Sequence, residues 1–344
     1  MKNLSLIRNS RILFLAAMVM SLVFTSCKSD DEEDDSTDIG NWIEKSSLDG
    51  DKRSKAASFV IGDKGYIVSG FIEDGDEYAT DTWVYDSTSN FWMELADFPG
   101  VGREDAVGFA VNGKGYVGLG YDGDNFERLK DFYEYDPATD TWTKISSFLD
   151  ETDEDVSGRR GAVAFTIGDY AYVGLGYDGS TQKDFWKYDP STDTWEQEFG
   201  FGGDKREDAS VFVIDEVAYI FGGQDNGTLV TDFYSFDGTT WTELNDTDSD
   251  DDNQVFVYAG AAFSIDGKGY VATGIAGSIN SNVWEYNPSN DSWTGLASFE
   301  GTSRQDANAF TFEDSAYVLL GENGSSQFDD IWYFEPNVEQ DSDD

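Results

Sequence analysis

Short segments in which apolar residues alternate with small or polar ones recur along most of the chain, and each is followed by turn residues. In one stretch these segments are 105–112, 115–121, 131–135 and 141–145. A period of two is typical of β-strands that bury one face. Connections such as 62–65 and 266–269 contain glycines that favour hairpin turns. We therefore predict an all-β fold made of four-stranded antiparallel units.

The unit repeats along the chain with a set of aromatic and glycine markers. Six tyrosines each stand four residues before a glycine: Tyr66, Tyr116, Tyr172, Tyr219, Tyr270 and Tyr317. A pair of aromatic residues follows in every copy, beginning with Trp83 and Tyr85 and ending with Trp332 and Phe334. Successive tryptophans of a third marker lie 50, 50, 53, 46 and 52 residues apart, at Trp42, Trp92, Trp142, Trp195, Trp241 and Trp293. A period near 50 predicts a stack of similar sheets rather than separate domains.

This glycine, tyrosine and tryptophan pattern resembles the kelch repeat, in which each unit is one blade of a β-propeller. The resemblance covers residues 42–335, and the glycine doublet of the family is complete only at Gly222 and Gly223. The sixth copy ends at Phe334 without its tryptophan, whereas Trp42 precedes the first copy without a blade of its own. We predict a six-bladed kelch-type propeller spanning 41–336, with the N-terminal strand completing the last blade.

The N-terminus resembles a bacterial lipoprotein signal. Three basic residues precede an apolar run from Ile12 to Phe24, which is too short to span a bilayer, and Cys27 follows it. We predict a signal peptide over 1–26, lipidation of Cys27 and an acidic linker over 27–40. The linker resembles the export signal of Bacteroidetes surface lipoproteins, which implies an outer-membrane lipoprotein facing the cell exterior. An acidic tail is expected over 337–344.

The charge of the chain limits its partners. The formal net charge is −47, and the signal peptide holds three of the 22 basic residues and none of the 69 acidic ones. Nucleic acid is therefore not an expected partner. Cys27 is the single cysteine, so no internal disulfide can form. We expect a monomer that reaches the membrane only through its lipid anchor.

Candidate binding residues lie before the first strand of each blade, on the side of the long loops. An arginine stands six residues before the strand phenylalanine in five copies, and an aspartate follows two residues later in three of them. The alternatives are an arginine fork that binds a carboxylate or sugar, and an arginine that pairs with an acid of its own or the next blade. These ligand-binding candidates are Arg53, Arg103, Arg159, Arg206, Arg304, Asp105, Asp208 and Asp306.

The absence of histidine from the chain excludes several kinds of catalysis. The copper site of galactose oxidase, a catalytic triad and a histidine zinc site cannot be built. Alternating aspartates at 246–252 resemble a calcium loop, but Asp251 replaces the glycine and Val257 the final glutamate, so we predict a solvated loop, no metal and no cofactor. A sugar mutarotase resembling N-acetylneuraminate epimerase needs only an acid and a base, for which Glu104 or Glu207 would serve.

Taken with the resemblance, these observations favour a surface-displayed binding or adhesion module over an enzyme. Its ligand would be a glycan or a protein held by the long-loop face, and the arginines would suit an anionic one. The cofactor-free mutarotase remains the alternative.

Overall fold

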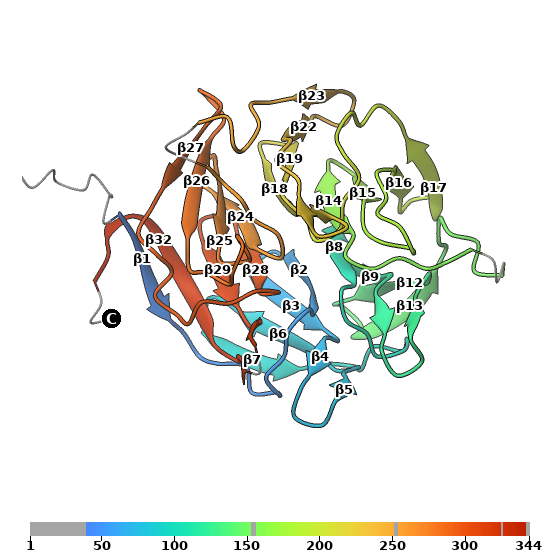
Figure 1. Cartoon of the computed structure of the whole chain (residues 1–344). Coiled ribbons are helices and arrows are strands. Elements are labelled where there is room, and N and C mark those ends of the chain that lie inside the picture. Colours follow the sequence, from blue (N-terminus) through green and yellow to red (C-terminus); the bar gives the residue numbers. More distant parts are fainter. Residues whose placement is uncertain (1–38, 153–155, 251–253, 325, 342–344) are drawn as a thin grey trace, which may run out of the picture. The chain divides into compact units, whose positions relative to one another are not determined.

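A computed structural model describes residues 39–152, 156–250, 254–324 and 326–341, and every regular element within them is a β-strand. Six four-stranded antiparallel sheets follow one another in chain order round a common axis (Figure 1). This arrangement confirms the predicted all-β, six-bladed propeller. The predicted signal peptide, Cys27 and the linker up to residue 38 lie outside the described residues.

Within each blade the strands lie in the following order from the axis outward. Blade one is β2 (Ala57–Ile61), β3 (Lys64–Val68), β6 (Thr82–Asp86) and β7 (Phe91–Glu94). Blade two is β8 (Val107–Val111), β9 (Lys114–Gly118), β12 (Phe132–Asp136) and β13 (Thr141–Ile145). Blade three is β14 (Val163–Ile167), β15 (Tyr170–Gly174), β16 (Phe185–Asp189) and β17 (Thr194–Glu198). Blade four is β18 (Ser210–Ile214), β19 (Val217–Phe221), β22 (Tyr234–Phe236) and β23 (Trp241–Glu243). Blade five is β24 (Ala261–Ile265), β25 (Lys268–Ala272), β26 (Val283–Asn287) and β27 (Ser292–Gly295). Blade six is β28 (Asn308–Thr311), β29 (Ala316–Leu319), β32 (Ile331–Glu339) and β1 (Ile39–Glu44).

Four small hairpins extend the loops between the second and third strands of a blade. They are β4 (Phe71–Ile72) with β5 (Glu77–Tyr78), β10 (Tyr121–Asp122) with β11 (Glu127–Arg128), β20 (Gln224–Asp225) with β21 (Thr228–Leu229), and β30 (Glu322–Asn323) with β31 (Ser326–Gln327). The predicted alternation of short and long connections therefore holds, with the long ones on one side of the propeller.

The ring closes through the two ends of the propeller. Strand β1 pairs antiparallel with β32, and Trp42 lies opposite Phe334 (Figure 1). Trp42 is fully buried, with its ring centroid 4.5 Å from that of Phe334 and 4.8 Å from that of Phe299. Closure by the N-terminal strand is confirmed. Strand β32 continues to Glu339, which pairs with Ile39, so residues 337–339 belong to the sheet and not to the tail that we expected.

The hydrophobic core lies between the blades rather than within any one of them. Six buried clusters each combine residues of two neighbouring blades, and the last joins blade six to blade one. In five blades the phenylalanine of the innermost strand stacks on the repeat tyrosine, as Phe109 does on Tyr116 with centroids 5.0 Å apart. A single blade cannot bury both faces, so its stability depends on its neighbours.

Polar contacts add a second link between neighbouring blades. Asp140, in the left-handed region with φ of 52°, accepts hydrogen bonds from the Tyr135 hydroxyl and from the backbone N–H of Ala96 in blade one. Asn90, Asp193 and Asp291 make the same pair of contacts elsewhere in the ring. Asparagine and aspartate tolerate this backbone conformation better than other residues with a side chain.

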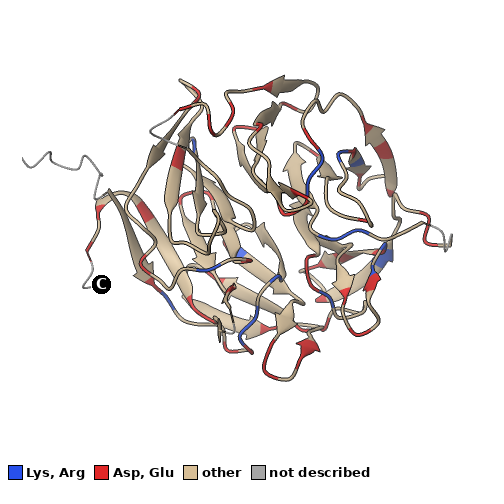
Figure 2. Cartoon of the chain, in the orientation of Figure 1, with Lys and Arg blue, Asp and Glu red and all other residues tan. Residues whose placement is uncertain are grey.

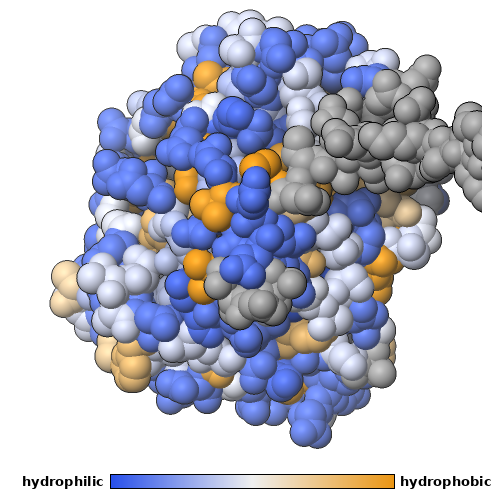
Figure 3. Space-filling model, turned by 90° about the vertical axis from the view of Figure 1, so that its left-hand side faces the viewer, coloured by the Kyte–Doolittle hydropathy of each residue, from blue (hydrophilic) through white to orange (hydrophobic). Residues whose placement is uncertain are grey.

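The exterior of the propeller is mainly polar. Acidic residues occur on every blade, and basic ones are fewer (Figure 2). The side that carries β1 and β27 shows hydrophilic residues with small, scattered hydrophobic patches (Figure 3). Within the described residues, no helix is long and apolar enough to cross a membrane.

Candidate functional site

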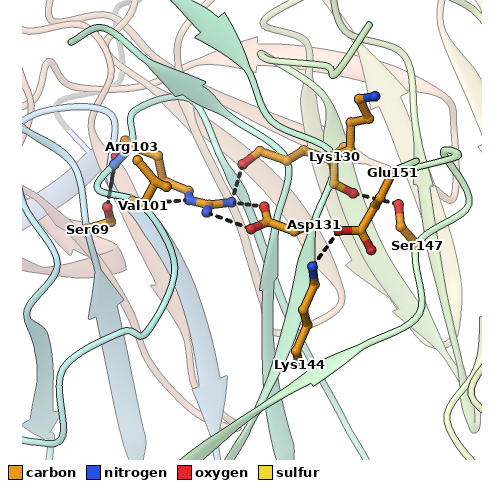
Figure 4. Close-up of polar contacts among 9 residues, drawn as sticks. Ser69, Val101, Arg103, Lys130, Asp131, Lys144, Ser147 and Glu151 are labelled. Carbon is orange, nitrogen blue, oxygen red and sulfur yellow. Dashed lines mark hydrogen bonds and ion pairs between the residues drawn. The ribbon is translucent and has the colours of Figure 1, made fainter. Parts of the chain in front are cut away.

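The five arginines predicted from the repeat are buried and paired with acids of their own blades. Arg103 has no exposed surface; its Nη1 donates to Asp131 Oδ1 at 2.7 Å and to the Leu119 carbonyl at 2.9 Å, and its Nε donates to the Val101 carbonyl at 2.9 Å (Figure 4). The ring of Phe98 lies 4.8 Å from the guanidinium carbon. The corresponding ion pairs are Arg53 with Asp81, Arg159 with Asp184, Arg206 with Asp232 and Arg304 with Asp330.

These contacts decide between the two interpretations that the sequence left open. Each guanidinium donates to a carboxylate and to at least one backbone carbonyl, although the buried Nε of Arg159 has no hydrogen-bond partner among the described residues. This is the structural pairing and not an open fork. Burial alone would raise the pKa of Asp131, but the hydrogen bonds and charge of Arg103 hold it below its ordinary value. The geometry therefore gives no support to an anion clamp made of these five arginines.

Blade five shows that the two partners of the pair are lost together. Val257 stands at the arginine position, and Asn282 stands where the other blades have the paired aspartate. A lone buried charge would be costly, whereas a pair replaced by uncharged residues is tolerated. The sequence does contain a signal for this pairing, which our sequence interpretation missed. In each of the other five blades an aspartate stands two residues before an aromatic residue of the third strand.

Two residues after each arginine position, six residues meet round the axis. They are Lys55, Asp105, Gly161, Asp208, Ala259 and Asp306, one from each blade, and all have φ between 52° and 58°. Their backbones form a closed ring of hydrogen bonds, because each N–H donates to the carbonyl of the preceding blade's residue at 3.0 to 3.2 Å. We predicted that the first strand of blade two begins at Asp105, but β8 begins at Val107. The left-handed conformation of Asp105 explains the difference, because it is incompatible with a β-strand.

A second layer of six residues lies next to this ring. Ser54, Glu104, Arg160, Glu207, Tyr258 and Gln305 each form an antiparallel bridge with the residue that follows the repeat glycine: Phe71, Tyr121, Tyr177, Gln224, Ile275 and Glu322 respectively. We call the ring and these bridged residues the axial site. The axial site contains three of the predicted site residues, Asp105, Asp208 and Asp306. It also brings together residues that are distant along the chain: the Ser54 hydroxyl donates to Glu322, 268 residues away.

The three ring aspartates come from alternate blades, and burial raises the pKa of each of them. Burial raises the pKa of Asp208 to about 7, helped by the charges of Asp105 and Glu207. Burial and the charge of Asp105 also raise the pKa of Asp306 well above its ordinary value, and burial raises that of Asp105 although Lys55 and Arg160 oppose it.

Two cations face these acids. Lys55 Nζ lies 3.2 Å from Glu104 Oε2. Burial alone would lower the pKa of Lys55, but the charges of Asp105, Glu104 and Asp306 outweigh it and raise the pKa. Arg160 is one-third exposed, and its Nη2 lies 3.7 Å from Glu207 Oε2.

Arg160 is held mainly by aromatic rings. Its guanidinium carbon lies 5.6 Å from the ring centroid of Tyr121 and 5.5 Å from that of Tyr177. Among the described residues no side-chain hydrogen bond from Arg160 is formed, so its planar donors remain available to a ligand. The repeat drew our sequence interpretation to Arg159, and Arg160 was missed because its position carries a different residue in every blade except for the two glutamates.

The other candidate chemistry of the sequence is only partly within the structure. In the acidic loop, residue 252 lies outside the described residues. Among the described residues, no group of three or more acidic side chains is arranged to hold a metal ion. A separate cavity of about 320 Å³ lies along the axis between the innermost strands of all six blades, where Phe59, Ala110 and Val213 are among its lining residues.

Comparisons with known proteins agree with the architecture. The family model of the KLHDC2/KLHL20/DRC7 Kelch-repeats domain matches residues 44–203. A solved structure described as "Structure of YjhT" is similar over 83% of this chain and 95% of that chain, with a TM-score of 0.69 and 18% sequence identity. At that identity the similarity shows the fold alone. No curated protein matches the sequence.

Proposed function

We propose that this six-bladed kelch-type propeller is a binding module whose axial site takes up a glycan. The observation that carries the proposal is Arg160, a half-buried guanidinium with unused donors, held between Tyr121 and Tyr177 and facing carboxylates. Sugar hydroxyls donate hydrogen bonds to carboxylates and accept them from guanidinium groups, and tyrosine rings offer flat apolar surface. The excess of acids over cations favours an uncharged or positively charged sugar over the anionic ligand that the five arginines first suggested.

The proposal is tested by screening the purified protein against an array of neutral, amino and acidic glycans, followed by saturation-transfer NMR on each hit. Arg160→Met should abolish binding of the hit, because it removes the guanidinium donors, which form an ion pair with Glu207 at 3.7 Å. Lys64→Met is the matched control, because Lys64 is the first residue of β3, next to the hairpin turn at the opposite end of blade one, and pairs with Asp86. Equal binding by both variants and the wild type would refute the proposal.

One observation also favours the mutarotase alternative. The carboxyl group of Asp208, with a pKa of about 7, can give and accept a proton near neutral pH, which is what opening and closing a sugar ring requires. NMR exchange spectroscopy of the anomers of N-acetylneuraminate and of any sugar hit tests this activity. Faster exchange with the wild type that is lost in Asp208→Asn would make the protein an enzyme, and unchanged exchange would leave it a binding module.

We also propose that the module is displayed on the cell surface through a lipid on Cys27. The short apolar segment, the single cysteine and the acidic residues after it support this placement. Protease digestion of intact cells should remove the propeller, and Cys27→Ser should release the protein from the membrane fraction. Protection of the wild type in intact cells would place it on the inner side instead.

A further inference from the structure

The hairpin between β10 and β11 presents one aromatic side chain to solvent. Phe126 is 83% exposed, the highest exposure among the large hydrophobic residues of the described chain. Its φ is 57°, in the left-handed region, which is unfavourable for a bulky residue. In the hairpin of blade one the same loop position is Asp76, a residue type that suits this conformation better. Phe126 thus combines backbone strain with exposed apolar surface.

The hairpin is nevertheless well supported. Asp122 is buried and accepts hydrogen bonds from the backbone N–H of Asn125 at 3.2 Å and from its Nδ2 at 2.8 Å. Gly123 lies so close to the Tyr78 side chain that an added Cβ would be 1.8 Å from the hydroxyl oxygen. The part of the loop that precedes Phe126 is therefore held by a side-chain cap and by close packing against Tyr78.

A cavity of about 540 Å³ lies beside Phe126, within the range of roughly 300–1,000 Å³ that is typical of ligand sites. Arg128, Lys130, Glu151, Ser157 and Gly158 contribute to its lining. The Arg128 Nε donates to Ser157 Oγ at 3.1 Å. Glu151 pairs with Lys144 at 2.6 Å (Figure 4). The cavity thus has a flat aromatic edge and a polar floor of both charges.

This cavity is joined to the axial site by stacked side chains. Arg128 lies over one ring, Tyr177, at 5.4 Å, and Arg160 lies over the same ring at 5.5 Å. Tyr121, the other ring beside Arg160, pairs with Arg128 across the hairpin. A continuous surface of rings and guanidinium groups therefore runs from the axis to Phe126 over blades two and three.

We propose that Phe126 is a second contact for the ligand, on which an outer sugar unit of an extended glycan stacks while an inner unit occupies the axial site. This inference rests on the proposed glycan binding and adds that the ligand is an oligosaccharide of several units. A sugar fits the polar floor and the single flat ring. The exposed acidic neighbours Asp124 and Glu127 would repel an anionic membrane surface or a nucleic acid.

The experiment measures affinity against chain length, with chito-, xylo- and manno-oligosaccharides of one to six units as probes. Wild-type affinity should rise with length for the ladder that binds. Phe126→Asn should lower the affinity for the long members by about 10-fold and leave the one-unit sugar unchanged, because stacking is lost only at the outer unit. Its melting temperature should be equal to or above that of the wild type, since asparagine accepts the left-handed conformation. Phe91→Ala is the control, because Phe91 is 59% exposed at the start of β7, on the opposite side of the propeller.

The outcomes separate the two proposals. Affinity that is independent of chain length, or an equal loss at all lengths in Phe126→Asn, would overturn the second contact alone, provided that Arg160→Met abolishes binding. Absence of binding to every ladder would overturn the axial glycan site and the second contact together.

Discussion

The buried pair of Arg103 and Asp131 offers the most direct test of how the propeller is held together. Blade five replaces the equivalent pair by Val257 and Asn282, so the corresponding changes in blade two are Arg103→Val and Asp131→Asn. Arg103 has no exposed surface, while the Asp131 side chain is 16% exposed. Either single change leaves one partner without its counter-charge, and the double change removes both charges.

The expected magnitudes follow from that difference. Breaking a buried ion pair by removing one partner costs about 3–5 kcal/mol. Because Asp131 keeps some contact with solvent, we expect Arg103→Val to lower the free energy of unfolding by about 3 kcal/mol, and Asp131→Asn by a similar amount. The double variant should cost no more than either single one, which corresponds to a coupling energy of about 3 kcal/mol in the cycle. It should not return to wild-type stability, because the carbonyls of Leu119 and Val101 lose their donor.

Urea unfolding followed by tryptophan fluorescence measures all four proteins. The pH dependence gives a second readout. The pKa of Asp131 is lowered in the folded state, so its stabilising contribution is present above the unfolded pKa of about 3.9 and disappears as the pH falls through the folded value. The difference in free energy of unfolding between the wild type and the double variant should therefore become smaller below about pH 4. A loss of less than about 1 kcal/mol in the free energy of unfolding of Arg103→Val would refute this account of the ion pair. So would a double variant whose loss equals the sum of the losses of the two single variants.

Three further outcomes are expected. Because the pKa of Asp208 is raised to about 7, its ionisation destabilises the folded state as pH rises from about 4 towards 7, so Asp208→Asn should raise the melting temperature relative to wild type at pH 8 but not at pH 4; an equal shift at both values would contradict this. Trp42→Ala should cost about 3–5 kcal/mol in urea unfolding, because a fully buried ring at the closure of the propeller is removed, and a cost near zero would argue against that closure. Asp140→Ala should lower the free energy of unfolding by about 2 kcal/mol, because two hydrogen bonds are lost, one of them from the Tyr135 hydroxyl. Asp140→Asn should be nearly neutral, because Asn90 has the same role in blade one. A lower melting temperature for Asp140→Asn than for Asp140→Ala would refute this role.

The fold could be predicted from the sequence because its information is local and repeated. Each blade carries its own alternation, turn glycines and aromatic markers, so six weak signals support one another. Trp42 was assigned to the last blade by counting markers, since a tryptophan without a blade at one end matches a blade without a tryptophan at the other. The exact end of β32 was not predictable, because Glu339 joins the sheet only through its pairing with Ile39.

The partners of the buried arginines could not be predicted from the neighbouring sequence alone. Their register identified Arg103 and its equivalents as inward-facing, but a chain with 69 acidic residues offers many partners, and only the packing of the third strand brings Asp131 within 2.7 Å. The recurrence of this aspartate, and its loss together with the arginine in blade five, marked the pair in the sequence itself.

By itself, the sequence determined the blades and their number, because the strands of one blade follow one another in the chain. It also determined the way in which the ring closes, because the tryptophan without a blade and the blade without a tryptophan stand at opposite ends of the repeats. Only the tertiary structure decided the axial site. Lys55, Glu104 and Arg160 occupy positions whose residue type varies from blade to blade, and they meet only because six blades converge on one axis. The raised pKa of Asp208 is likewise a property of that convergence, since it arises from burial and from the charges of Asp105 and Glu207, one from another blade and one from its neighbour in the chain.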